Sequence, residues 1–256
     1  MNQIRLAVKC TPRPPDLKRF IRIARHFGLS GLEVCELPEV MVEIPQEKRV
    51  QNIAAAARGV ISHLCFHEPL WEGPLESVRM ADLASLNNYG AIKLAKETIS
   101  DAVETGIAFG GENEVLVNMH VIGYASPEEV NVEGKLACLR RGERVLQMLR
   151  DYARELCEKK GFVRAGRPMA LIVRENNPPT HYLGVQSMID FHPSEFASLD
   201  LAANLDFAHL QLYLNYLAAK KPKIRSLGPR STARSILLRA GTTSSIRYGA
   251  VFVSCT

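Results

Sequence analysis

Five residues with metal-binding side chains stand at or just after the ends of apolar, strand-like runs. They are His67 in LCFHEP, His120 in VLVNMHVIG, Glu175 in ALIVRENN, and Asp206 with His209 in ANLDFAHL. Imidazoles and carboxylates are common protein ligands of divalent metal ions. When such residues recur once per strand–helix unit, a parallel α/β barrel gathers them at the rim where its strands end. The spacing therefore predicts a divalent-metal site.

The donor set also indicates the chemistry. Mg²⁺ and Mn²⁺ prefer carboxylate oxygens, whereas imidazoles favour Zn²⁺ or Mn²⁺. A metal held by these groups could polarise a sugar carbonyl and its neighbouring hydroxyl for proton transfer, or activate water against a phosphodiester. Glu175 and Asp206 are the strongest candidates, because a carboxylate after an apolar run is costly to bury unless it is paired or metal-bound. Asp206 and His209, three residues apart, can point toward the same ion or ligand.

Structural roles compete with the metal role of the histidines. A strand-end or loop histidine is often a hydrogen-bonded scaffold residue, and this alternative stays open for His67 and His120. The role of His209 depends on that of Asp206. Alternation along a strand gives His63 the same side as His67, where we expect a buried histidine one layer deeper.

The elements that would position these residues alternate between strand and helix. Strands are expected at 4–10, 29–37, 59–67, 114–122, 168–176 and 203–207. Helices are expected from Asp16 to Gly28, at about 46–57, at about 76–106, up to about Lys160, and at 209–220. The first helix should bury one stripe, formed by Leu17, Phe20, Ile21, Ala24 and Phe27.

Six successive strand–helix units require parallel strands with right-handed crossovers. No GxGxxG motif follows the first strand, which disfavours a dinucleotide-binding sheet. Candidate ligands at successive strand ends favour a (β/α)8 TIM-barrel type of α/β fold over an open doubly wound sheet.

The chain is short for a whole barrel. Six units take about 220 residues and a full barrel typically about 250, so two more units of about 30 residues each do not fit after residue 220. No His follows His209 and no Asp or Glu follows Asp206. We expect a metal-binding, incomplete barrel domain at 1–220 and an atypical basic tail at 221–256. The tail is either a genuine segment that pairs or frays, or the product of a reading-frame change near 220–230, which we favour because acidic residues vanish where the strand–helix rhythm stops.

Charge and hydropathy limit the classes of partner that the chain is expected to have. Eight of the 32 basic residues lie in 220–256, so residues 1–219 hold 24 basic against 27 acidic residues. This slightly negative body lacks the basic footprint of a nucleic-acid-binding protein. No apolar run approaches the roughly 20 residues of a membrane span, and the start MNQIRLAVKC lacks a signal peptide's apolar core. We expect a cytoplasmic protein with no membrane partner.

Taken in order, the HEP after strand three, the histidine ending strand four, the REN after strand five and the DFAH after strand six resemble the xylose isomerase-like barrel superfamily. That group includes sugar and sugar-phosphate isomerases and epimerases, and abasic-site nucleases of the endonuclease IV type. The resemblance covers about residues 3–217. It implies that Glu175 and Asp206 are metal ligands, and that His209 binds a second metal or the substrate. His67 and His120 match the two histidines of the nuclease branch.

The resemblance implies three alternative functions. The first is a metal-dependent isomerase or epimerase acting on a sugar or sugar phosphate, with Glu175 and His209 as catalytic residues. The second is a zinc phosphodiesterase acting on abasic DNA, which alone would give the chain a nucleic-acid partner. The third is a truncated, non-catalytic barrel, because residues 210–256 hold no counterpart of the family's strand-seven His and strand-eight Glu. Exposed edges at strands one and six would favour a homo-oligomer.

Overall fold

A six-stranded parallel sheet forms the centre of the fold in the computed structural model, which describes residues 7–72, 79–120, 134–175, 181–182, 185–186 and 202–204. Its strands are β1 (Ala7–Cys10), β2 (Gly31–Cys35), β3 (His63–His67), β6 (Val115–His120), β9 (Ala170–Glu175) and β12 (Ala202–Asn204). They lie side by side in the same order as along the chain.

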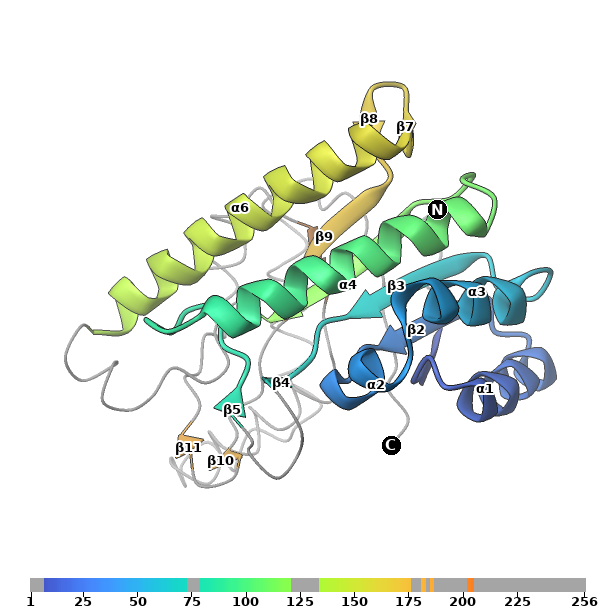
Figure 1. The fold of residues 1–256 in the computed structure, drawn as a ribbon, viewed down its shortest axis with the longest axis horizontal. Coiled ribbons are helices and arrows are strands. Elements are labelled where there is room, and N and C mark those ends of the chain that lie inside the picture. The colour runs from blue at the N-terminus through green and yellow to red at the C-terminus, as the bar shows by residue number, and fades with distance from the viewer. Residues whose placement is uncertain are drawn as a thin grey trace, which may run out of the picture.

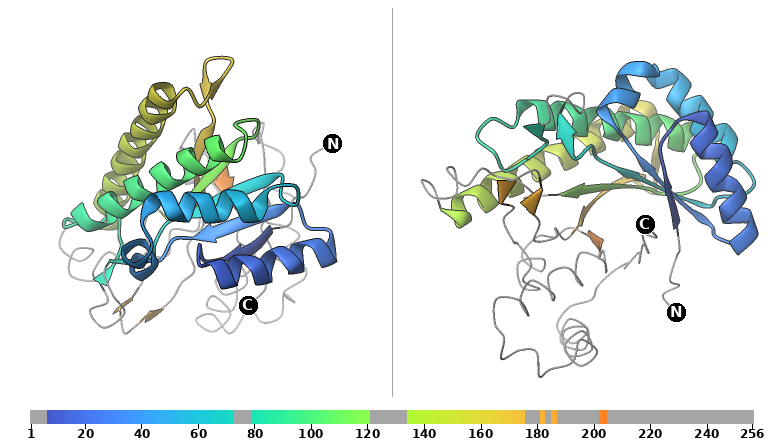
Figure 2. Two further views of the ribbon diagram at one scale, coloured as in Figure 1. Left: turned by 45° about the vertical axis from the view of Figure 1, so that its right-hand side comes forward. Right: turned by 90° about the horizontal axis from the view of Figure 1, so that it is seen from below.

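This strand order identifies the fold class. A doubly wound sheet reverses its strand order at a switch point, whereas right-handed crossovers between sequential neighbours leave every helix on the same face. The main helices are α1 (Pro14–Phe27), α3 (Gln46–Ala57), α4 (Tyr89–Ala108) and α6 (Lys135–Lys160). They lie on one side of the sheet (Figures 1 and 2). A one-sided, sequentially ordered parallel sheet is the wall of a TIM barrel, so the predicted fold class is confirmed.

Several short elements were not predicted. A short helix, α2 (Pro38–Glu43), follows β2. Three antiparallel hairpins are formed by β4 (Trp71–Glu72) with β5 (Arg79–Met80), β7 (Val163–Arg164) with β8 (Arg167–Pro168), and β10 (His181–Tyr182) with β11 (Val185–Gln186). Two-residue strands carry too few side chains for a periodic pattern to reveal them.

Two predicted helix starts are wrong. The first helix begins at Pro14, not at Asp16, because proline's fixed φ and missing N–H suit the first helical turn. Its C-terminal end at Gly28 is as expected, with a left-handed φ of 63°, but Phe27 is 68% exposed rather than part of the buried stripe. The helix expected from about residue 76 begins only at Tyr89, since the preceding residues form the β4–β5 hairpin and turns.

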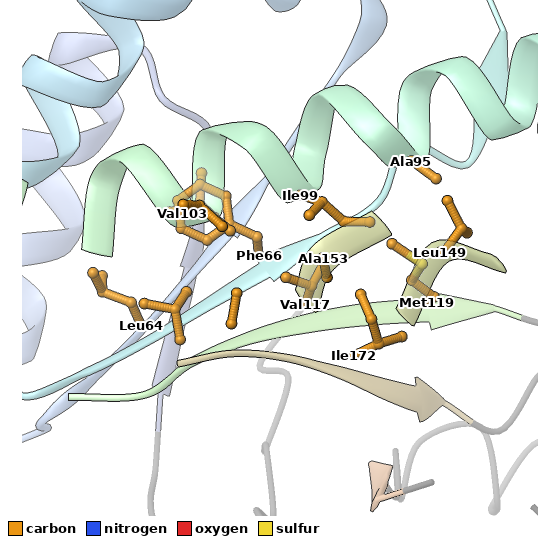
Figure 3. Packing of buried hydrophobic residues seen from close by; sticks show 14 of the residues in the cluster. Leu64, Phe66, Ala95, Ile99, Val103, Val117, Met119, Leu149, Ala153 and Ile172 are labelled. Carbon is orange, nitrogen blue, oxygen red and sulfur yellow. The ribbon is translucent and has the colours of Figure 1, made fainter. Parts of the chain in front are cut away.

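The apolar core lies between the helices and the sheet. Figure 3 shows Ile99 and Val103 of α4 beside Phe66 of β3, with Val117 of β6 and Ile172 of β9 below them. Along each of these strands, the core residues occupy every second position. The intervening side chains therefore face away from the helices, toward the barrel interior.

Candidate metal centre

The inner face of the sheet carries many more polar side chains than the helix-facing side. Alternation places the following residues on it: Lys9, Glu33, Cys35, His63, Cys65, His67, Asn118, His120 and Glu175. Strand register brings the polar ends of β3, β6 and β9 together, because His67 pairs with Asn118 and His120 with Glu175. The backbone thus delivers three of the five predicted ligands to one place.

His67, His120 and Glu175 form a compact, buried cluster. One ligand atom from each lies within 4.8 Å of the others. Nε2 of His67 is 3.6 Å from Oε2 of Glu175, and Nε2 of His120 is 3.7 Å from Oε1 of the same carboxylate. The two imidazole rings have centroids 4.8 Å apart. The three side chains are only 2–5% exposed.

His67 is held as a neutral ligand. Its Nδ1 lies 2.7 Å from the backbone carbonyl oxygen of Glu68, so the Nδ1–H tautomer donates there and leaves Nε2 directed at Glu175. Burial, followed by the positive charge of Lys9, lowers the pKa of His67 to about 3. A histidine whose second nitrogen is fixed by a carbonyl is the usual arrangement of a metal ligand.

His120 lies instead between two carboxylates. Its Nδ1 is 3.7 Å from Oε1 of Glu68, and its backbone N–H donates to the same oxygen at 2.5 Å. Burial alone disfavours the imidazolium, but Glu175 and Glu68 outweigh it and raise the pKa of His120 to about 10. Burial in turn raises the pKa of Glu68.

Two supporting residues were missed by the sequence analysis. The amide nitrogen of Asn118 donates to Oε2 of Glu175, and Glu68 contacts both the backbone and the ring of His120. Glu68 directly follows His67 in the HEP motif, and Asn118 lies two residues before His120 on the same face of its strand. Both positions therefore indicated that these residues lie near the predicted ligands. Their partners belong to other strands, which the chain's order alone does not reveal.

The donor set fits a divalent metal. Two imidazole nitrogens and one carboxylate oxygen are the protein ligands of several catalytic zinc sites. Carboxylate and carbonyl groups that hold the ligating side chains complete the pattern. Asp206 and His209, the two remaining predicted ligands, lie outside the described residues. Strand β12 pairs with β9 so that Asn204 stands opposite Glu175.

Solved structures share this architecture. The 3-keto-D-glucoside 4-epimerase from E. coli, in its apo form, matches with a TM-score of 0.56 and 13% identity over 98% of this chain and 92% of that one. An AP endonuclease of family 2 from Brucella melitensis matches with a TM-score of 0.52 and 14% identity over 99% and 92%. At these identities the likeness establishes the barrel fold. No protein-family model and no curated protein sequence matches the chain.

Two other expectations from the sequence concern membrane spans and the C-terminal tail. Among the described helices, none has the length and apolar character needed to cross a membrane. The expected basic tail at 221–256 lies outside the described residues.

Proposed function

We propose that this chain is a divalent-metal-dependent isomerase or epimerase acting on a sugar or sugar phosphate by proton transfer beside a carbonyl. One observation carries the proposal: two buried imidazoles and a carboxylate converge at the carboxyl ends of neighbouring barrel strands, where barrel enzymes place their active sites. Similarity to an epimerase in fold supports the same reaction class.

Each residue has a role in this proposal. His67, His120 and Glu175 hold the metal, and Asp206 completes its ligand set. A bound Mn²⁺, Mg²⁺ or Zn²⁺ supplies a Lewis acid that polarises the carbonyl and acidifies the adjacent C–H. His209 and Glu175 are proposed as the groups that move the proton. Glu68 and Asn118 orient His120 and Glu175.

A second candidate is a zinc phosphodiesterase that acts on abasic DNA. The His67–His120 pair favours it, because imidazoles suit Zn²⁺ better than Mg²⁺, and so does the fold of the AP endonuclease. The slightly negative body disfavours a DNA partner. A non-catalytic barrel, self-association and a cytoplasmic location stay predictions.

Metal binding tests the shared basis of both activities. We expect the purified protein to bind one divalent ion at micromolar or lower concentration, measured by calorimetry with Zn²⁺ and Mn²⁺. Glu175→Gln should weaken binding by about a hundredfold, since it removes the only described carboxylate that faces both imidazoles. Glu155→Gln, an exposed change on α6, is the matched control. A wild-type protein that binds neither metal would remove both catalytic proposals.

Activity then separates the two candidates. The metal-loaded protein is assayed on a panel of ketoses, ketose phosphates and 3-keto-glycosides, and on a duplex with one abasic site. Turnover of a sugar that is lost in Glu175→Gln supports the isomerase or epimerase. Cleavage of the duplex alone would replace it with the phosphodiesterase.

A further inference from the structure

Lys9 is a charged residue of the inner face that is not one of the candidate metal ligands. It lies on β1, one residue before the strand ends, and stands opposite Glu33 of β2. Its Nζ is 3.4 Å from Oε1 of Glu33. Strand alternation puts Lys9 on the same inner face as the candidate ligands, and strand register places it level with Cys65, two residues before His67.

Exposure distinguishes Lys9 from its surroundings. The side chain of Lys9 is 38% exposed, whereas that of Glu33 is 7% exposed and the three candidate ligands are 2–5% exposed. An ammonium has three N–H donors, and Glu33 is its one ion-pair partner in the part of the chain that the structure describes. The donors of Lys9 that do not face Glu33 therefore remain open to another molecule on the inner face of the sheet.

Lys9 also keeps its charge. Burial opposes the ammonium, but Cys35, Glu33 and Glu175 outweigh that effect and raise the pKa of Lys9 above its ordinary value. An accessible ammonium of fixed charge is a point of attachment for phosphate and carboxylate oxygens. Neutral hydroxyls gain less from it, because they lack the opposite charge whose Coulomb attraction adds to the hydrogen bond.

We propose that Lys9 binds an anionic group of the substrate, a phosphate or a carboxylate, while the neighbouring metal centre holds the reacting carbonyl end. The inference rests on the proposed function and narrows its substrate class to acidic sugar derivatives. Lys9 is then a specificity-determining residue that contacts substrate, and Glu33 is the buried group that positions it.

Binding of charged and neutral sugars to the Zn²⁺-loaded protein tests this role. The probes are D-glucose 6-phosphate, D-gluconate and the neutral D-glucitol, titrated by calorimetry into wild type, Lys9→Met and Lys9→Arg. Lys93→Met, which removes an exposed lysine on α4, is the control. We expect Lys9→Met to weaken one anionic probe by about tenfold or more and to leave D-glucitol unchanged. Lys9→Arg should retain most of the affinity.

The pattern of loss identifies the anion and can overturn the proposal. A selective loss for the 6-phosphate assigns a phosphate, and one for gluconate a carboxylate. Equal losses for D-glucitol would mean that Lys9 has a structural role. Unchanged affinities in Lys9→Met, or a wild type that prefers neither anion, would also overturn it. Zn²⁺ affinity, measured for each variant, separates this failure from failure of the metal centre.

Discussion

The two histidines of the candidate metal centre occupy similar strand ends but differ in charge. His67 donates to a neutral carbonyl and is neutral throughout the physiological range, with a pKa of about 3. His120 lies between Glu68 and Glu175, which hold a proton on it up to about pH 10. A metal ion that enters this site must therefore replace the proton of His120, since only the neutral imidazole coordinates.

Proton release on metal binding is the first prediction from this difference. At pH 7.5 we expect about one proton to be released per Zn²⁺, measured by calorimetry in buffers of different ionisation enthalpy. Apparent affinity should rise about tenfold per pH unit between pH 7 and 9 and level off as the pH approaches the pKa of His120. His26→Gln, on the exposed face of α1, should leave the profile unchanged. An affinity independent of pH would contradict the assigned charge of His120.

Glu68 provides the second prediction at this scale. Glu68→Gln keeps the shape of the side chain but removes the charge beside Nδ1 of His120, so the pKa of His120 should fall. Loss of this orienting carboxylate should weaken metal affinity about tenfold to a hundredfold at pH values where His120 is already deprotonated, whereas at neutral pH the lower pKa of His120 offsets part of that loss, because less proton has to be displaced. NMR titration of the His120 ring in the metal-free protein measures the pKa directly. An unmoved titration midpoint would mean that Glu68 has only a structural role.

Among the elements, helix α4 packs unusually close to the sheet. A Cβ added at Gly106 would lie 2.5 Å from Cζ of Phe162 and 2.9 Å from Cγ2 of Val115. Glycine allows the end of α4 to approach β6 and the chain that follows α6. The contact fixes the height of α4 above the strands that carry His67 and His120.

Replacing this glycine should reverse the usual effect of alanine in a helix. Alanine is favoured over glycine by about 1 kcal/mol in helix interiors, but overpacking in a full core costs about 1–3 kcal/mol. We therefore expect Gly106→Ala to lower the free energy of unfolding, measured with urea. Ala55→Gly, on the exposed face of α3, calibrates the propensity effect at about 1 kcal/mol. A more stable Gly106→Ala protein would show that α4 can shift without cost.

Long elements were predictable from local pattern, and short ones were not. Helix α3 has the predicted bounds, the third strand ends at His67 as predicted, and the fifth strand, expected to end at residue 176, ends at Glu175. The start of α4 was misplaced because Arg79–Met80 pairs with β4 and turns lead from there to Tyr89. Pairing between distant segments overrides local propensity, and a single sequence does not record it.

At the scale of the whole molecule, the strand-end residues of the metal centre could be predicted as a group, but buried contacts between the packed helices could not. The convergence of His67, His120 and Glu175 follows from parallel strands in sequential order. By contrast, Arg49 on α3 forms a buried ion pair with Asp101 on α4 at 2.6 Å, and also approaches Glu36 at 3.6 Å. Nothing in the sequence links these residues, which come together only when the helices pack.

This second buried cluster makes the stability of the metal-free protein depend on pH. Burial and the neighbouring Asp101 raise the pKa of Glu36 to about 8, although Arg49 opposes the shift. Between about pH 4.5 and 8 the folded chain thus holds a proton on Glu36 that the unfolded chain has lost. His120 does the same between about pH 6.5 and 10. His67 has the opposite effect, but only between about pH 3 and 6.5.

Between pH 6.5 and 8, Glu36 and His120 change the free energy of unfolding in the same direction. There the folded protein binds more protons than the unfolded one through both Glu36 and His120, so the free energy of unfolding must fall as the pH rises. The slope is at most about 1.4 kcal/mol per pH unit for each group. Urea unfolding of the metal-free protein from pH 5 to 9 measures it. Glu36→Gln should flatten the curve, and saturating Zn²⁺ should offset the loss at high pH, because the metal binds the folded state with His120 deprotonated. A stability that rises from pH 6.5 to 8 would contradict both assignments.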